Sequence, residues 1–198
     1  MGTIEVICGP MYSGKSEELI RRIRRVEIAG YEPLVVKPII DSRYSYTDVV
    51  SHSGLSREAS VVEKSSDIIN KFYGVEEVVA IDEVQFFDEG IIDVIKYLRG
   101  ENVRVIIAGL DTDYRGEPFG QMGYILAIAD KVDKLQAICH NCKGFDATMT
   151  QRLVDGEPAE WDAETIVVGG RESYEARCRG CWEAPVKTGD HPGQLTLF

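Results

Sequence analysis

The chain has 198 residues, 44% hydrophobic and 28% charged, which suits a soluble globular protein with one full core. Its net charge of −11 disfavours nucleic acid and acidic membranes, which repel an acidic surface. The sequence has no apolar run long enough to span a bilayer and no secretory pattern at its N-terminus. We therefore expect a cytoplasmic protein with a small substrate and no nucleic-acid or membrane partner.

The first predicted strand, residues 3–8, leads into the stretch Gly9-Pro10-Met11-Tyr12-Ser13-Gly14-Lys15-Ser16. The stretch matches the phosphate-loop pattern G-x-x-x-x-G-K-[ST], whose glycines let successive backbone N–H groups face one anion. A helix predicted over 15–29 adds its positive dipole end. The expected contacts to ATP phosphates come from Gly9, Met11, Tyr12, Ser13, Gly14, Lys15 and Ser16. The Ser16 hydroxyl is also a candidate ligand of Mg²⁺.

The predicted helix carries four arginines, at positions 21, 22, 24 and 25. A nucleic-acid patch is one interpretation. The favoured one is a solvated face, on which Glu17 pairs with Arg21 and Glu18 pairs with Arg22 at i,i+4 spacing.

A second strand, 34–37, is followed by a long polar segment, 39–60. Beside a phosphate site, Asp41 becomes a candidate for Mg²⁺ and Arg43 for phosphate. For His52, a surface position and a catalytic role both stay open.

The strand predicted over 77–82 ends in Asp82, the usual place of a carboxylate that holds Mg²⁺ through water, and Glu83 follows it on the opposite side. Further elements are expected as helices 65–72, 91–98 and 122–129 and strands 103–108 and 131–137. This alternation predicts an α/β fold, a P-loop NTPase-like and mostly parallel sheet with helices on both faces. The loop 109–120 then lies at the same carboxyl edge as the phosphate loop.

Two C-x-x-C knuckles, Cys139 with Cys142 and Cys178 with Cys181, indicate a structural zinc ion held by four thiolates. A disulfide or redox pair is the less favoured alternative. The residues between the knuckles are expected to form a hairpin from 147–154 and 165–168. These features divide the chain into a P-loop, ATP-binding domain, 1–138, a zinc-binding subdomain, 139–185, that contacts the loop 109–120, and a tail, 186–198.

Along nearly its whole length the chain resembles the zinc-containing, cytosolic type of thymidine kinase. The matching motifs lie at 9–16, 41–44, 82–87, 108–111, 118–120, 150–153, 168–170 and Tyr174. All four knuckle positions are cysteine here, where many relatives have lost or replaced one. Tyr114 stands where relatives often have phenylalanine, which leaves its hydroxyl unexplained.

The resemblance implies transfer of the ATP γ-phosphoryl group to the 5′-hydroxyl of deoxythymidine, with Mg²⁺ on Ser16, Asp82 and Asp41. Glu83 would be the general base and Arg43 would stabilise the transition state. The nucleoside would lie under the loop 109–120. Its implied contacts are Met11, Phe86, Leu110, Tyr114, Phe119, Thr150, Val167 and Tyr174. The resemblance also implies feedback inhibition by dTTP and a homotetramer.

Two other classes share the phosphate loop. A regulatory GTPase would need N-K-x-D, but Asn70-Lys71 is followed by Phe72-Tyr73. An ATPase that acts on nucleic acid through a zinc ribbon would fit both motifs but not the acidic surface.

Overall fold

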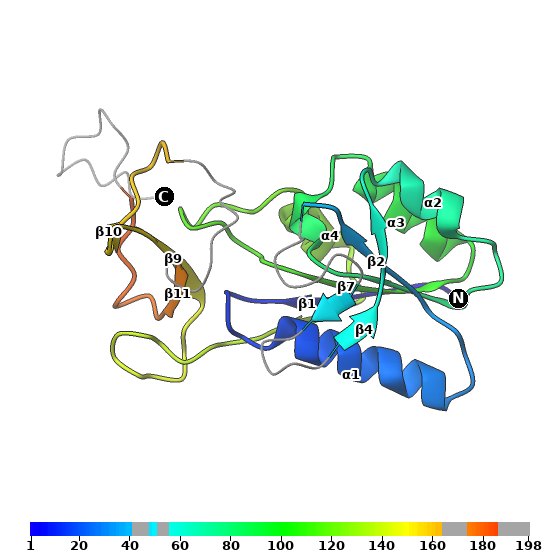
Figure 1. Cartoon of the computed structure of the whole chain (residues 1–198). Helices are drawn as coiled ribbons and strands as arrows, with labels where there is room; N and C mark the ends of the chain where they lie inside the picture. The colour runs from blue at the N-terminus through cyan, green and yellow to red at the C-terminus, as the bar shows by residue number, and fades with distance from the viewer. Residues whose placement is uncertain (41–47, 51–55, 164–173, 186–198) are drawn as a thin grey trace.

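A six-stranded sheet forms the centre of the computed structural model, which describes residues 1–40, 48–50, 56–163 and 174–185 (Figure 1). The strand order is β5-β2-β6-β7-β1-β8, and every neighbouring pair is parallel. The strands are β1 (Thr3–Cys8), β2 (Leu34–Pro38), β5 (Ser60–Val62), β6 (Val78–Ile81), β7 (Arg104–Gly109) and β8 (Lys131–Lys134). The predicted α/β class is confirmed.

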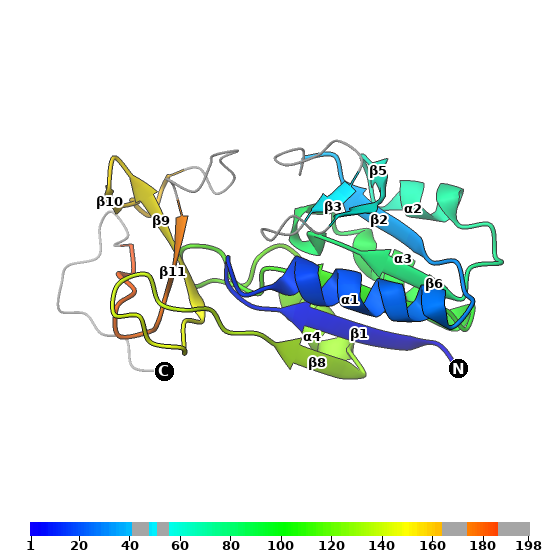
Figure 2. The ribbon, with the colours of Figure 1, turned by 60° about the horizontal axis from the view of Figure 1, so that its bottom comes forward.

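Helices cover both faces of this sheet because successive strand residues point to opposite sides. In β1, Ile7 packs with Leu19 and Ile23 of α1 (Lys15–Ile28) on one face. Its neighbour Val6 belongs to the core on the other face. That core is covered by α2 (Ser66–Lys71), α3 (Ile91–Gly100) and α4 (Met122–Ile128). Figure 2 shows the long α1 helix lying over the sheet, alongside β1.

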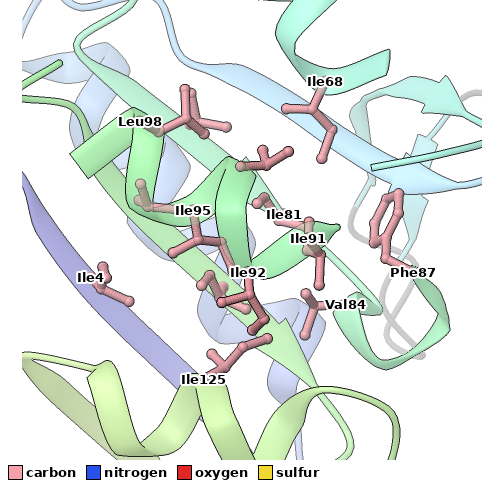
Figure 3. Packing of buried hydrophobic residues seen from close by; sticks show 14 of the residues in the cluster. Ile4, Ile68, Ile81, Val84, Phe87, Ile91, Ile92, Ile95, Leu98 and Ile125 are labelled. Atoms are coloured by element: carbon pink, nitrogen blue, oxygen red, sulfur yellow. The ribbon is translucent and has the colours of Figure 1, made fainter. Parts of the chain in front are cut away.

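The larger core lies beneath α3, whose apolar positions repeat at helical spacing. Ile91, Ile95 and Leu98 are fully buried and meet Ile68 of α2 and Ile125 of α4 (Figure 3). Truncating one such isoleucine to alanine typically costs about 2–5 kcal/mol, because the packed neighbours collapse only partly into the cavity. This core fixes the carboxyl ends of β6 and β7, where the site lies.

The polar segment after β2 contains more structure than its composition indicates. β3 (Asp48–Val50) and β4 (Ser56–Glu58) pair antiparallel, and Val49 is buried on the α1 face. These strands and β5 have three residues each, too few for an alternating pattern to reveal them.

The interpretation of the α1 arginines as a solvated face is wrong for Arg22. Its side chain is only 5% exposed, and its guanidinium forms ion pairs with Glu5, Glu18 and Asp133. Arg21 pairs with Glu18 at 2.6 Å, at i,i+3 spacing. The expected Glu18–Arg22 pair is confirmed, and Arg22 joins α1 to β1 and β8.

Beyond the carboxyl edge of the parallel sheet lies a second, antiparallel sheet in the order β10-β9-β11 (Figures 1 and 2). Its strands are β9 (Met149–Val154), β10 (Glu157–Pro158) and β11 (Tyr174–Arg177). β9 matches the predicted strand 147–154, whereas the predicted partner 165–168 lies outside the described residues. Among the described residues, no helix has the length and apolar character needed to cross a membrane.

Candidate active site

The phosphate loop owes its shape to residues with positive φ. Gly9 has φ 142°, and a Cβ there would lie 2.5 Å from the carbonyl oxygen of Leu135. Gly14 has φ 86° and directly precedes α1. Tyr12, a non-glycine residue, has φ 64°. The sequence therefore needs glycine at position 9 for space and accepts local strain at Tyr12.

Inside the loop, the Pro10 carbonyl oxygen accepts hydrogen bonds from Ser13 Oγ and from Lys15 Nζ, both at 2.8 Å. Gly14 offers no side chain to cap α1, so the positive end of the helix faces the loop without a capping oxygen from that residue. Backbone N–H groups, an ammonium and a helix N-terminus converge here, as in sites that bind phosphate.

Lys15 is buried, and several carboxylate groups act on its charge. Burial lowers the pKa of its ammonium, and the charges of Glu83, Asp82 and Asp111 oppose that effect. The ammonium thus stands close to three carboxylates. A phosphate that enters the loop would meet an ammonium whose charged form these carboxylates favour.

The acidic pair lies at the carboxyl end of β6. Asp82 is buried, and its backbone N–H donates to Val36 of β2. Its Oδ1 accepts the Glu83 N–H at 3.0 Å. Glu83 adopts the left-handed conformation, φ 49° and ψ 42°, just before the 3-10 helix η1 (Val84–Phe86). Both candidate residues are thus at the edge of the sheet where the phosphate loop begins.

Four of the predicted nucleoside contacts lie together in two pairs, and a fifth contacts the phosphate loop. The Met11 N–H donates to Thr150 Oγ1 at 3.2 Å, although 139 positions separate these residues in the sequence. The rings of Phe86 and Phe119 meet edge to face, with centroids 5.5 Å apart. Tyr174 is buried, and its carbonyl oxygen accepts the Tyr12 hydroxyl at 3.3 Å.

The structure shows which groups the Tyr114 hydroxyl contacts. The hydroxyl oxygen lies 2.8–3.0 Å from the carbonyl oxygens of Glu160, Trp161 and Ala163. Arg115 donates to two of the same carbonyls, those of Trp161 at 2.7 Å and Ala163 at 3.1 Å. The loop 109–120 is therefore tied to the segment after β10, in the region that was expected to contact it.

The four knuckle cysteines form one cluster. Their sulfur atoms all lie within 4.8 Å of one another, and every cysteine is a free thiol. Sulfurs bound tetrahedrally to zinc lie about 3.8 Å apart, so the donor set fits this metal. Burial raises the pKa of Cys139, but backbone N–H groups, first that of Cys178, lower it to about 6. The thiols of Cys178 and Cys142 raise the pKa of Cys181 to about 12. A divalent cation would stabilise all four as thiolates.

A family model described as thymidine kinase matches residues 2–182. The chain belongs to the thymidine kinase family. This membership supports a nucleoside kinase over the GTPase and the zinc-ribbon ATPase considered above.

Among solved structures, the chain is similar to a DNA replication initiation factor, with 11% identity and a TM-score of 0.41 over 67% of this chain and 40% of that one. It is also similar to AMPPCP-bound DnaA from Aquifex aeolicus, with 11% identity and a TM-score of 0.42 over 68% and 40%. The chain thus spans 40% of the length of each protein. Structural similarity at 11% identity says nothing about the activity of this chain.

Three candidate residues of the thymidine kinase resemblance, Asp41, Arg43 and Val167, lie outside the described residues, as does His52. Two buried polar residues were not singled out from the sequence. Gln85 hydrogen-bonds Glu83, and its position two residues after that carboxylate was the available signal. Asp111 is only 4% exposed and forms an ion pair with Lys134 at 2.7 Å. Asp111 is part of the motif 108–111 of the resemblance, and that was the available signal.

Proposed function

We propose that the protein is an ATP-dependent thymidine kinase, which transfers the γ-phosphoryl group of ATP to the 5′-hydroxyl of deoxythymidine. The observation that carries this proposal is the thymidine kinase family match over residues 2–182. The grouping of a phosphate loop, a buried lysine and two strand-end carboxylates supports it, because phosphoryl transfer needs these parts in one place.

The phosphate loop and Lys15 bind the ATP phosphates. Ser16 and Asp82, together with Asp41, would hold Mg²⁺, and a hydroxyl with carboxylates suits this hard cation. When bound, the ion would neutralise charge on the phosphate oxygens. Lys15 exchanges its hydrogen bond to the Pro10 carbonyl for a phosphate oxygen.

Glu83 is the general base. The 5′-hydroxyl oxygen attacks the γ-phosphorus, its proton passes to the Glu83 carboxylate, and ADP leaves with the electrons of the broken P–O bond. In a loose transition state most of the catalysis is positioning and charge stabilisation, the second of which Arg43 supplies.

The nucleoside lies between the aromatic pair and the zinc subdomain. Phe86 and Phe119 provide one apolar wall, and Leu110 and Tyr114 complete the surroundings of sugar and base. Met11 and Thr150 lie at the 5-methyl group. Backbone groups near Val167 and Tyr174 bind the pyrimidine edge.

The remaining assignments concern the whole molecule. Cys139, Cys142, Cys178 and Cys181 hold a structural zinc ion that completes subdomain 139–185, next to the kinase domain 1–138. Four thiolates leave no position for a water ligand, so the metal takes no part in the chemistry. The enzyme acts in the cytoplasm as a homotetramer, and dTTP inhibits it.

The test is ADP release from ATP and Mg²⁺ over a panel of nucleosides. Thymidine should stimulate ADP release by at least tenfold over the nucleoside-free rate and yield dTMP in equal amount. Guanosine and a DNA oligonucleotide serve as controls. Stimulation by DNA, or ATP hydrolysis that no nucleoside accelerates, would reject the proposal.

A further inference from the structure

Gln85 joins two parts of the site through its side-chain amide. It lies in η1 and is only 3% exposed. Its Nε2 donates to Glu83 Oε2 at 2.5 Å, and its Oε1 accepts the Leu110 N–H at 3.1 Å. Only this orientation of the amide satisfies both neighbours, because a carboxylate needs a donor and an N–H needs an acceptor.

Two glycines of the loop 109–120 approach Gln85 closely. A Cβ on Gly109 would lie 2.5 Å from Gln85 Oε1, and a Cβ on Gly120 would lie 2.4 Å from the Gln85 carbonyl oxygen. Gly120 also has φ 52°, which favours glycine. Both ends of the loop 109–120 therefore pack against this one residue.

We infer that Gln85 is a positioning residue that orients the Glu83 carboxylate and, through Leu110, sets the nucleoside loop relative to it. The inference rests on the proposed role of Glu83 as base. A free glutamate samples several rotamers, and a hydrogen bond to one oxygen selects the plane in which the other faces the substrate. The left-handed backbone at Glu83 adds to this need, since it aims the side chain from a strained turn.

Two variants separate the two hydrogen bonds. Gln85→Leu removes both, whereas Gln85→Glu keeps an acceptor for the Leu110 N–H and replaces the amide donor with a carboxyl group, which shares one proton with Glu83 and so weakens Glu83 as a base. Both should lower kcat about 10- to 100-fold, the range that misplacement of a catalytic group produces. Only Gln85→Leu should also raise the KM for thymidine, because only there does the loop lose its anchor.

A double-mutant cycle with Glu83→Gln distinguishes positioning from a general loss of structure. If Gln85 acts through the base, either substitution at 85 should lower kcat less than about threefold in the Glu83→Gln background. Val84→Ala is the matched control: it weakens the packing of the same turn, where Val84 is fully buried, and keeps both hydrogen bonds.

Additive losses in the cycle, or an equal fall of kcat in Val84→Ala, would overturn the inference. So would a kcat within twofold of wild type for Gln85→Glu, which preserves the size of the side chain and remains testable should Gln85→Leu not fold. The wild-type assay is independent of these outcomes: if thymidine does not stimulate the unmodified enzyme, the proposed function itself fails.

Discussion

The ring of Tyr12 lies 5.2 Å from the ring of His140, centroid to centroid, at an interplanar angle of 51°. Tyr12 belongs to the phosphate loop, and His140 lies between the two cysteines of the first knuckle. The imidazole is fixed in turn, since its Nδ1 accepts the Ala176 N–H at 3.1 Å. The cysteine cluster thus supports the phosphate loop from outside, at the residue whose backbone has a positive φ.

This contact predicts that removing the metal affects the nucleotide site as well as the knuckles. Cys178→Ser should lose the bound zinc, lower the melting temperature and raise the KM for ATP several-fold, because His140 no longer has a fixed position behind Tyr12. Elemental analysis, thermal unfolding and steady-state kinetics measure the three effects.

Cys8→Ala is the control, since Cys8 is buried in β1 outside the cluster and burial raises its pKa to about 11. It should keep one zinc per chain and an unchanged KM for ATP. A zinc-free Cys178→Ser enzyme with wild-type kinetics would show that the two sites are independent.

The proposed role of Glu83 as general base gives the sharpest chemical prediction. Glu83→Gln should lower kcat by about 10²–10⁴, the usual contribution of general-base catalysis, and leave binding of ATP and thymidine within a few-fold. Glu89→Gln, at an exposed carboxylate six positions later, should leave both unchanged. Turnover of Glu83→Gln close to wild type would assign the base to another residue.

The parallel sheet can be predicted well from the sequence, because the signals of its strands come from residues that are neighbours in the chain. β6 is a continuous apolar run, β7 is apolar after Arg104, and β1 is mostly apolar. The phosphate-loop pattern marks the junction of β1 with α1. Arg22 was misjudged because its partner Asp133 is 111 residues away and reaches it only when β8 pairs with β1. Contacts between such distant residues leave no periodic signal.

Contacts between residues that are distant in the sequence also limit prediction of the site. Lys15 begins α1, and Asp82 and Glu83 directly follow β6, all at positions that sequence patterns can locate. The role of Gln85 depends on the left-handed turn at Glu83 and on two glycines of a later loop. No single stretch of sequence contains that arrangement.

The buried arginine gives a prediction about stability. Arg22→Met should lower the free energy of unfolding at pH 7 by about 2–3 kcal/mol, because three carboxylates lose a shared cation. Glu5 and Asp133 are 15% and 34% exposed, so water compensates part of the loss expected at a fully buried pair. Urea unfolding measures the change, and Arg24→Met, at an exposed position of α1, should alter it by less than about 0.5 kcal/mol.

The same group of charges predicts acid sensitivity. The hydrogen bond from the Arg21 guanidinium lowers the pKa of Glu18 from 4.5 to about 2. Burial opposes this shift, and Arg22 adds to it. Arg22 likewise lowers the pKa of Asp133. Because the folded pKa is depressed, the stabilisation is fully present above pH 4.5 and is lost as the pH falls toward 2. Arg22→Met should show a smaller loss over that window, and an equal loss in both proteins would contradict this assignment.

Tyr114→Phe tests the tie between the loop 109–120 and residues 160–163. The substitution removes one hydrogen bond, worth about 1 kcal/mol, and Arg115 still donates to two of the carbonyls. We expect the KM for thymidine to rise about two- to fivefold with kcat unchanged, because in the proposed complex the loop surrounds the nucleoside but supplies no reacting group. Tyr97→Phe, at a half-exposed position of α3, is the control. An unchanged KM would show that the hydroxyl serves folding alone.

The last prediction concerns inhibition by dTTP. The thymidine and phosphate sites must lie one phosphoryl transfer apart, so a molecule with the right base and three phosphates can occupy both at once. Such a ligand combines the base contacts of the substrate with the anion contacts of ATP, which favours tight binding without new protein groups. Inhibition should be competitive with thymidine and should weaken at least tenfold in Lys15→Met, since the buried ammonium would hold the triphosphate. The affinity of Lys15→Met for thymidine, measured by calorimetry without ATP, should stay within twofold of wild type, because in the proposed complex Lys15 contacts phosphate and not the nucleoside. Inhibition that excess thymidine does not relieve, or that Lys15→Met leaves intact, would place the inhibitor at a separate site.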